Sequence, residues 1–522
     1  MRDWLPDGDL VWFVLDTVAA LDTGSLHGRY RLGGPGRAAY EPEMLLALVI
    51  YAWSQGVRSS RRIQRLCERD VAFRVICAGD APDHSTICRF IAGCQDVVED
   101  LFAQVLVGCR RLGLVRLGTV AIDGTKIAAN GSLLANRTAE GIGRQLARLD
   151  EVEQTGRVVA AVIAEQLAVD GAEDAQFGLD RVGDELPAEV ANPDSRKARL
   201  EAVLAEVQRR RPPPPPPAAP RPEVIASGRR KGGRTPKGVD AVAEAEAVLA
   251  RVSAEVAARQ QQAAARRAQR GAAGLPVYGR PFVAVEAHTQ VRQARTNLDR
   301  ARQAAVKRAA RQAEQTDTKI NLTDPDSRIM KTRSGWVQGY NCQLAVTADQ
   351  IILAATATCD PTDVGHFTPM TDQALAAAAA LPVSLVRNVP TRIATVLADA
   401  GYDCDANLAH PGPDRLIATT TRHGLHRRPE PASPPPEHAT ARQRMDHRLA
   451  TPDGRALYKR RGATVEPSIG QIKDVTGLRR FRRRGQAAAH AELILTCMTH
   501  NLLKLHRALT PAHSLTAALT PA

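Results

Sequence analysis

The chain has 522 residues, and its 70 lysines and arginines exceed its 56 aspartates and glutamates, giving a formal net charge of +14 at pH 7. This length is more than one hydrophobic core fills, so a single small domain is excluded. The surplus of positive charge favours an anionic partner, and first of all nucleic acid.

The cysteines and the apolar segments narrow the class of protein further. The nine cysteines include no Cys-x-x-Cys pair, which argues against a structural zinc site and predicts reduced, mostly buried thiols. The most apolar window, residues 44–53, is about half as long as a membrane span, and the N-terminus lacks the apolar run of a signal peptide. We therefore expect a cytoplasmic protein without membrane contact.

Residues 1–117 are predicted to form an all-helical N-terminal domain. The stretches "EPEMLLALVIYAWSQG" and "SSRRIQRLCERDVAFRVI" carry apolar residues at helical spacing and have helix start and stop signals. Several arginines of this region could form a solvated basic face or contact DNA, and for each of them a solvated face is at least as good an interpretation as a DNA contact. These residues are Arg58, Arg61, Arg62, Arg65 and Arg89.

The texture of the chain changes twice after this domain. A first strand is predicted in residues 118–136, and residues 137–317 then become rich in Ala, Arg, Glu and Gln with apolar residues at helical spacing, which predicts a long, coiled-coil-like helical insertion. A proline tract and a Gly/Lys/Arg segment at about 209–238 predict an exposed linker, better explained by disorder than by DNA contact. Strand patterns return in residues 318–510, and residues 511–522 form a tail.

Five runs have the composition and periodicity of strands: "GTVAID", "GWVQGYNCQLAV", "IILAATATC", "RIATVLAD" and "RLIATTT". The Ala-rich helix "DQALAAAAAL" lies between the third and the fourth of them. The fold class predicted is α/β, with the long helical insertion after the first strand.

Three acids stand out as candidates for chemistry. Asp123 and Asp399 each follow an apolar run and precede a small residue, so we expect both at the C-terminal ends of strands, where ligands sit in open α/β sheets. Glu466 would lie on one helix face with Gly470 and Lys473. Pro467 predicts that this glutamate lies at a kink or a helix start rather than in mid-helix.

Carboxylates without a nitrogen or sulfur ligand suit Mg²⁺ or Mn²⁺, and two such ions can cleave a phosphodiester. Each acid taken alone is at least as well explained as a loop cap or a salt-bridge partner, so it is their joint arrangement that favours a metal site. Asp324 and Asp326 in "TDPDSR" form an ordinary Asp-Pro-Asp turn and stay outside the candidate triad.

Two other enzyme classes are excluded by their motifs. The segment "IDGTK" is superficially similar to the nucleophile motif of haloacid dehalogenase-type phosphatases, but Ala121 occupies the position of the nucleophile. The chain has no Gly-x-x-x-x-Gly-Lys-Ser/Thr loop, which argues against an ATP-driven motor.

The chain resembles the bacterial insertion-sequence transposases of the DDE type, whose catalytic domain has an RNase H-like (retroviral integrase) fold with a mixed sheet. The resemblance rests on five segments in order: "DHSTICRF", "AIDGTKIAANGS", "TDPDSRIMKTRSGWVQGYNCQLAV", "LADAGYD" and "YKRRGATVEPSIGQIKDVTGLRRFRRRG". It implies that Asp123, Asp399 and Glu466 are a metal-binding catalytic triad holding Mg²⁺ or Mn²⁺, with two ions. It also implies a Tyr/Arg/Glu/Lys signature of Tyr458, Arg461 and Lys473 around Glu466. Arg461 lies one residue further from Glu466 than the common spacing, so Arg460 is an alternative.

The resemblance implies a DNA transposase of a mobile element. It would act as a homodimer on DNA, bind terminal inverted repeats and target DNA, catalyse strand cleavage and strand transfer, and associate with the nucleoid. DNA contacts are expected from Tyr458, Arg461 and Lys473, and from the arginines of the segment "LRRFRRRG": Arg479, Arg480, Arg482, Arg483 and Arg484. The alternatives are a catalytically inactive or repurposed DNA-binding protein of the same fold, and an RNase H-like nuclease.

Overall fold

The computed structural model describes residues 2–28, 39–155, 193–209, 241–278, 281–315, 319–420, 424, 429–431 and 433–509. The chain divides into two compact units, one of residues 1–203 with 320–522 and one of residues 204–319. The linker predicted at about 209–238, apart from its first residue, and the tail predicted at 511–522 lie outside the described residues.

The N-terminal region is helical, as the sequence predicts. Four of its helices follow a residue whose side chain accepts a backbone N–H of the first turn: Asp9 before α1, Ser59 before α4, Asp70 before α5 and Asp83 before α6. The elements are η1 (Arg2–Trp4), α1 (Leu10–Ala20), α2 (Gly24–His27), α3 (Pro42–Ser54), α4 (Ser60–Arg69), α5 (Val71–Ile76), α6 (His84–Gly93), η2 (Cys94–Asp96) and α7 (Val98–Arg111).

A six-stranded mixed sheet follows this helical region in the same unit. Its strands are β1 (Thr119–Ala128), β4 (Arg328–Thr332), β5 (Gly335–Thr347), β6 (Ile352–Thr358), β7 (Thr395–Ala398) and β8 (Asp414–Ile417). The order is β4-β5-β1-β7-β8, and β6 also pairs with β5. β5 runs antiparallel to β1, β4 and β6, whereas β7 is parallel to β1 and β8 is parallel to β7. All five predicted strands are therefore present, and the fold is mixed α/β.

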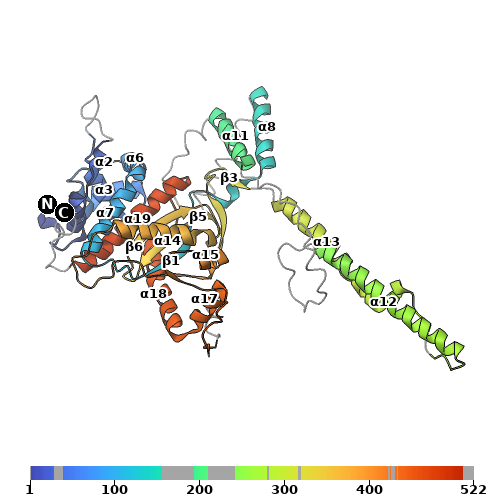
Figure 1. Ribbon diagram of the computed structural model, residues 1–522. Coiled ribbons are helices and arrows are strands. Elements are labelled where there is room, and N and C mark those ends of the chain that lie inside the picture. Colours follow the sequence, from blue (N-terminus) through green and yellow to red (C-terminus); the bar gives the residue numbers. More distant parts are fainter. Residues whose placement is uncertain are drawn as a thin grey trace. The chain divides into compact units, whose positions relative to one another are not determined.

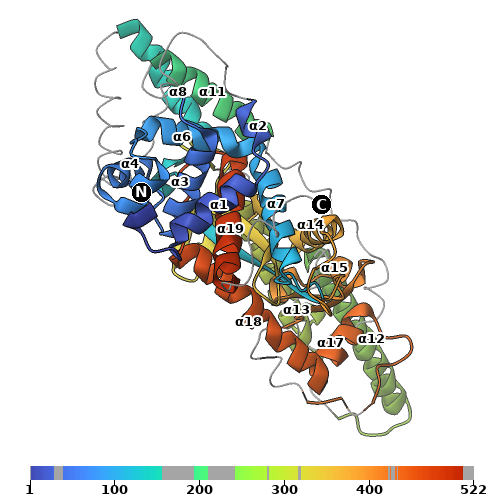
Figure 2. The same ribbon diagram turned by 90° about the vertical axis from the view of Figure 1, so that its left-hand side faces the viewer.

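Helices pack on the strands of this sheet. They are η7 (Val364–His366), α14 (Phe367–Ala380), η8 (Ala400–Tyr402), α15 (Asp405–Ala409), α17 (Ala441–Ala450), α18 (Pro452–Asp474) and α19 (Gln486–Ala508). α14 contacts β6, β5 and β1, and α18 contacts β1, β5 and β7 (Figure 1). Most residues of α19 are buried because this helix packs against β6 and against α7 and α3; Figure 2 shows α19 beside these two helices. The helical region and the sheet thus share one hydrophobic core.

A two-stranded pair carries the chain into the helical insertion. β2 (Asn136–Arg137) pairs antiparallel with β3 (Ile320–Asn321), although 182 residues separate Arg137 from Ile320 along the chain. α8 (Ala139–Thr155) and α11 (Pro193–Arg209) are the described helices at the start of the insertion. Arg199 of α11 donates hydrogen bonds to the carbonyl oxygens of Leu322 and Thr323, just after β3.

The second unit contains two long antiparallel-paired helices. α12 (Ala241–Ala272) and α13 (Thr289–Gln315) pack along each other, with η6 (Val285–Ala287) before α13 (Figure 1). Their few buried residues include Val256 of α12 and Leu298 of α13, and Arg302 forms an ion pair of 2.8 Å with Glu246. None of the described helices of the chain is both long and apolar enough to cross a membrane.

Candidate active site

Asp123 and Asp399 lie side by side on neighbouring strands. The parallel register of β1 and β7 pairs Ala121 with Leu397, so two residues further on Asp123 is level with Asp399. β7 ends at Ala398, and the carboxylate of Asp399 accepts a hydrogen bond of 2.9 Å from the backbone N–H of Gly401.

The expectation that Asp123 ends its strand is wrong. β1 continues through Asp123 to Ala128, because the long strand β5 pairs with it in an unbroken register from Val120 to Ala128. On the side of β7, however, Asp123 has no neighbouring strand residue, since β7 stops one residue before it becomes level with Asp123. Asp123 and Asp399 therefore lie level with each other at the point where β7 ends and β1 continues.

α18 brings Glu466 towards these aspartates, and here the sequence expectation also needs correction. Glu466 lies in mid-helix, because α18 runs without interruption from Pro452 to Asp474 with Pro467 inside it. A proline has no N–H, so the carbonyl of Ala463, four residues earlier, loses its helical partner. The side chain of Gln350 donates a hydrogen bond of 3.3 Å to that carbonyl and compensates for the loss.

Arg461 joins two of the three acids. Its Nη1 donates to Asp123 Oδ2 at 2.8 Å, and its Nη2 lies 3.5 Å from Glu466 Oε1. Its neighbour Arg460 is exposed. Despite the unusual spacing to Glu466, Arg461 is thus the arginine of this helix that reaches the acids.

The pKa of Asp123 is raised, because its carboxylate lies in a largely buried place near a second carboxylate. Burial raises its pKa, the negative charge of Asp399 raises it further, Arg461 opposes both, and the result is a pKa of about 6. Burial by itself would lower the pKa of Arg461, but the effects of Asp123, Tyr458 and Asp399 together outweigh burial, so this pKa is raised. Glu466 differs from Asp123 because 62% of its side chain is exposed. The oxygen atoms of the three acids do not all lie within 4.8 Å of one another, so in this conformation Arg461 occupies the space between Asp123 and Glu466.

Two further residues of the predicted signature lie around this group. Lys473 Nζ donates to the hydroxyl of Thr125 at 2.6 Å, two residues along β1 from Asp123 and on the same face of the sheet. Burial lowers the pKa of Lys473. Burial raises the pKa of Tyr458, and the charge of Arg461, with which its hydroxyl forms a hydrogen bond, opposes this rise.

A polar cluster packs against Gly124, on the face of β1 opposite to that of Asp123. A Cβ atom at Gly124 would lie 2.5 Å from Gln343 Nε2 and 2.6 Å from Asp363 Oδ1, so no other residue fits without displacement. Asp363 Oδ1 accepts hydrogen bonds from Lys126 at 3.0 Å, Asn341 at 2.7 Å and Gln343 at 2.8 Å. Sequence reasoning missed Asp363, whose segment "CDPTDVGHF" has the composition of an ordinary turn.

Tyr402 links this cluster to the aspartates. Its side chain is fully buried, and its hydroxyl donates to the amide oxygen of Gln343. Burial and the charges of Asp123, Asp363 and Asp399 all raise its pKa well above the ordinary range. Tyr402 stays neutral and positions the loop that carries Asp399, a role visible in the sequence only as part of "LADAGYD".

The arginine-rich segment "LRRFRRRG", residues 478–485, runs along the end of β1. Backbone hydrogen bonds join Ala128 N to Arg479 O at 3.2 Å and Phe481 N to Ala128 O at 2.8 Å. Phe481 is buried and packs edge-on against Tyr340, with ring centroids 5.7 Å apart. The predicted DNA-binding arginines flank this anchor and remain partly or fully exposed: Arg479, Arg480, Arg482, Arg483 and Arg484.

A buried acid that the sequence analysis missed holds this segment. Glu492 of α19 accepts backbone N–H groups of Arg482 and Arg483, at 3.0 and 3.4 Å from its Oε2. Its Oε1 forms an ion pair of 2.7 Å with Arg58, and both side chains are almost completely buried. Arg58, expected on a solvated face or at DNA, therefore lies inside the protein and joins the helical region to residues 478–485.

The two aspartates of the turn "TDPDSR" also serve this segment. Asp324 is buried and accepts hydrogen bonds from the hydroxyl of Tyr340 at 2.7 Å and from Gly485 N at 3.2 Å. Asp326 accepts from Gln486 N at 3.1 Å. Both therefore hold the first residues of α19, away from the three candidate acids.

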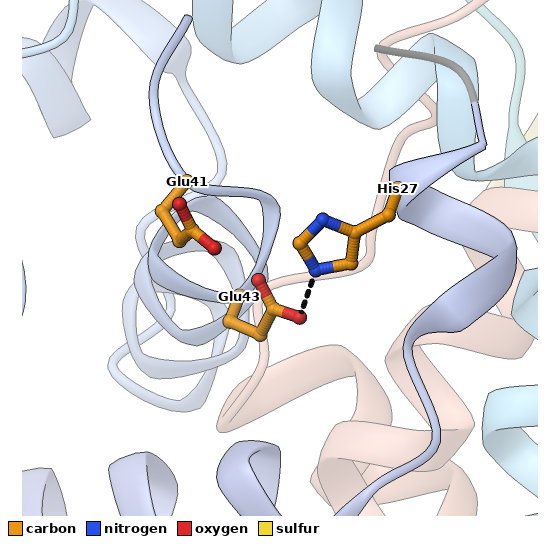
Figure 3. Close-up of side chains that lie close together, drawn as sticks. All are labelled: His27, Glu41 and Glu43. Carbon is orange, nitrogen blue, oxygen red and sulfur yellow. Dashed lines mark hydrogen bonds and ion pairs between the residues drawn. The ribbon is translucent and has the colours of Figure 1, made fainter. Parts of the chain in front are cut away.

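Within the part of the chain that the structure describes, one group of three residues has ligand atoms close enough to share a metal ion: His27, Glu41 and Glu43 (Figure 3). His27 Nε2 lies 2.6 Å from Glu43 Oε1, which also accepts from the hydroxyl of Thr23. These contacts connect the end of α2 to the start of α3, and the group shares no residue with the predicted triad.

Comparison with known proteins gives matches near both ends of the chain. A family model described as "Transposase DDE domain" matches residues 427–506, which include Tyr458, Arg461, Glu466 and Lys473. A second, described as "Transposase domain (DUF772)", matches residues 1–93 in the helical region. A search of curated proteins and a search of solved structures found no match. Together with the order of its motifs, the two domain matches support an insertion-sequence transposase of the DDE type.

Proposed function

We propose that this transposase binds the terminal inverted repeats of its element, cleaves DNA strands in a metal-dependent reaction, and joins the resulting 3′-hydroxyl to target DNA. The observation that carries the proposal is the alignment of Asp123 and Asp399 on neighbouring strands, with Glu466 linked to Asp123 through Arg461. Two partly buried carboxylates next to each other are costly unless cations neutralise their charge.

The strand order supports an RNase H-like catalytic domain. Omitting the short strand β4, the order β6-β5-β1-β7-β8 has three antiparallel strands followed by two that are parallel to β1. This order agrees with the mixed sheet that the resemblance implies, and it puts the first acid on the central strand and the second just after its parallel neighbour.

The residues present fit a divalent metal. Asp123, Asp399 and Glu466 offer only carboxylate oxygens, which suits Mg²⁺ or Mn²⁺, and DDE transposases as a family normally use divalent metals. The raised pKa of Asp123 and its ion pair with the guanidinium of Arg461 mark a place where positive charge is favourable. When bound, two such ions would activate the attacking oxygen and stabilise the leaving oxygen of a phosphodiester.

The other residues of the site act by orienting and neutralising. Arg461 holds the carboxylates of Asp123 and Glu466 towards each other. Lys473, fixed on Thr125, presents a positive charge beside Asp123, where a DNA phosphate would approach. Tyr458 is the third member of this helix face, and we assign all three to contact with DNA at the site.

DNA binding is assigned to the basic segment 478–485 and the helical N-terminal region. The partly or fully exposed arginines of that segment offer forked donors that match phosphate oxygens. Because two element ends must be joined, we propose a homodimer on the DNA, associated with the nucleoid when bound.

The test is a cleavage and strand-transfer assay on DNA that carries the ends of the element. Asp123→Asn, Asp399→Asn and Glu466→Gln should each nearly abolish both steps in Mg²⁺ or Mn²⁺, because each removes one oxygen-charge ligand while keeping the shape. The control is Asp372→Asn, an exposed acid of α14, which should cleave like the wild type. Full activity in excess EDTA would refute the metal-dependent reaction, and wild-type protein that binds the ends without ever cutting them would favour a non-catalytic DNA-binding protein.

A further inference from the structure

A cavity of about 320 Å³ lies between the helical N-terminal region and the basic segment 478–485. Helices α3, α4 and α6 contribute one side, and residues of the basic segment contribute the other. The residues that matter here are Trp53, Arg58, Arg89, Ala92, Arg482 and Arg483. The three candidate acids are absent from its lining, so it is distinct from the candidate active site.

Two buried donors of this cavity lack a hydrogen-bond acceptor. Trp53 is 2% exposed and Arg58 is 6% exposed, and neither Trp53 Nε1 nor Arg58 Nε has a hydrogen-bond partner among the residues that the structure describes. A buried donor left without a partner costs about 1–3 kcal/mol. Both donors therefore leave room for acceptor atoms supplied by an occupant of the cavity.

The charge around the cavity favours an anion. Glu492 is the one acid among the lining residues, and its two oxygens are already engaged by Arg58 and by the backbone N–H groups of Arg482 and Arg483. The charge of Arg58 is therefore matched, whereas Arg89, Arg482 and Arg483 add positive charge. Burial lowers the pKa of Arg58, and the charge of Arg482 lowers it further, so a negative group in the cavity would relieve a repulsion that the protein itself contains.

The size and the walls of the cavity ask for more than a phosphate ion. Its volume is close to the lower limit of small-molecule pockets, roughly 300 Å³. Trp53, Ile91 and Ala92 give it an apolar side, which a phosphate would not cover but a nucleobase would. The hydroxyls of Ser59 and Ser60 add polar groups beside that apolar side.

We propose that this cavity holds one nucleotide of a bound DNA strand, with its phosphate on Arg89, Arg482 and Arg483 and its base against Trp53, Ile91 and Ala92. Acceptor atoms of the nucleotide take the two free donors of Trp53 and Arg58. The inference rests on the proposed function, because it assumes that the bound nucleotide belongs to the DNA on which the protein acts. It adds a specific nucleotide site, built jointly by the helical region and the basic segment, to the general phosphate contacts.

Calorimetric titration of the full-length chain with a deoxynucleoside 5′-monophosphate tests the site. We expect one nucleotide per chain, and binding of the deoxynucleoside alone or of inorganic phosphate weaker by roughly ten-fold, since each offers part of the contacts. Arg482→Ala should weaken nucleotide binding by roughly ten-fold through loss of a charged hydrogen bond, and Trp53→Phe, which removes only the N–H donor and part of the ring, by about five-fold.

Cavity filling provides the sharpest variant. Ala92 is exposed at the rim of the cavity, so Ala92→Trp should abolish nucleotide binding without loss of thermal stability. Two matched controls keep their binding because they lie outside the lining: Ala81→Trp, exposed just before α6, and Arg74→Ala, exposed on α5. Absence of nucleotide binding by the wild type, or binding that survives Ala92→Trp, overturns the proposal.

Competition with DNA identifies the source of the nucleotide. If the occupant comes from DNA, a duplex carrying the element end displaces the mononucleotide, and the duplex binds Ala92→Trp more weakly than wild type. A mononucleotide that stays bound beside saturating duplex overturns the DNA origin. The two proposals can fail separately. If the wild type binds the nucleotide as described but never cleaves element ends, the nucleotide site is supported and the proposed cleavage reaction is refuted. If it cleaves normally but does not bind the nucleotide, only the nucleotide site is refuted. Asp123→Asn should bind the nucleotide like wild type.

Discussion

Nη1 of Arg461 lies 2.8 Å from Oδ2 of Asp123, although 338 positions separate the two residues in the chain. The same guanidinium reaches Glu466 from the other side at 3.5 Å. A single fixed cation thus ties the central strand of the sheet to the helix that carries the third acid.

This contact predicts unequal effects for two adjacent arginines. Arg461→Ala should lower the cleavage rate by roughly 100-fold, because Asp123 and Glu466 lose the group that orients them. Arg460→Ala should cleave at close to the wild-type rate, because Arg460 is exposed. The measurement is the rate of strand cleavage on element-end DNA at saturating Mg²⁺. If Arg460→Ala lowers the cleavage rate more than Arg461→Ala does, the assignment of the signature arginine to Arg461 is wrong.

The raised pKa of Asp123 predicts how stability depends on pH. The pKa rises from an ordinary 3.8 to about 6 on folding, so between these values the folded chain binds more protons than the unfolded chain, and the free energy of unfolding falls as the pH rises. Asp123→Asn has no carboxyl group at this position, so its free energy of unfolding should not fall in this way. Without divalent ions, the free energy of unfolding of the variant should exceed that of the wild type by up to about 3 kcal/mol at pH 7, and the difference should disappear near pH 4.

Chemical denaturation across that pH range, in EDTA, measures this difference. Asp372→Asn serves as the control and should follow the wild type at every pH. Added Mg²⁺ should stabilise the wild type and leave Asp123→Asn nearly unchanged. A stability gap that stays constant from pH 4 to pH 7 would contradict a raised pKa at Asp123.

Hydrophobic periodicity is enough to predict the helical region and the five strands. These features are local, since they depend on which face of a short segment must be buried. The two errors of geometry come from partners distant in sequence. β1 continues past Asp123 because β5 pairs with it, and α18 continues through Pro467 because Gln350 takes the carbonyl of Ala463. Neither partner can be inferred from the segment itself.

The candidate site divides in the same way. Asp123, Asp399, Glu466 and Lys473 carry local signals, namely an apolar run before the acid, small neighbours and helical spacing. Asp363 and Glu492 have no such signal. Asp363 lies in a turn of ordinary composition, and Glu492 occurs in an amphipathic stretch, so only the tertiary contacts with Gly124 and Arg58 reveal them.

Gly124 should not tolerate even one methyl group. Gly124→Ala places a Cβ at 2.5 Å from Gln343 Nε2 and 2.6 Å from Asp363 Oδ1, and we expect a loss of about 1–3 kcal/mol in unfolding free energy from overpacking. The matched control is Gly470→Ala in α18, where a Cβ meets nothing within 4 Å and should stabilise the helix by about 0.5–1 kcal/mol. Opposite signs in thermal denaturation confirm the prediction, and equal shifts contradict it.

Removing the acid from the buried ion pair should be costly. Glu492→Gln leaves Arg58 charged and buried without a counter-charge, which predicts a loss of about 3–5 kcal/mol. Glu99→Gln is the control, since 71% of the Glu99 side chain is exposed where it pairs with His490, and its stability should stay close to that of the wild type. Urea denaturation of both variants decides, and near-equal midpoints would mean that the pair contributes nothing.

The short pair of β2 and β3 has a consequence for how the chain folds. β1 must find β5 across more than 200 residues, a search that would normally make formation of the sheet slow. Pairing of Asn136 with Asn321 and of Arg137 with Ile320 closes that interval like the stem of a hairpin, while α12 and α13 assemble from neighbouring sequence. Because loop-closure entropy grows only logarithmically with loop length, the stem allows the interval behind it to gain or lose residues at little thermodynamic cost. Evolution can therefore vary the insertion without rebuilding the sheet on which the three acids are placed.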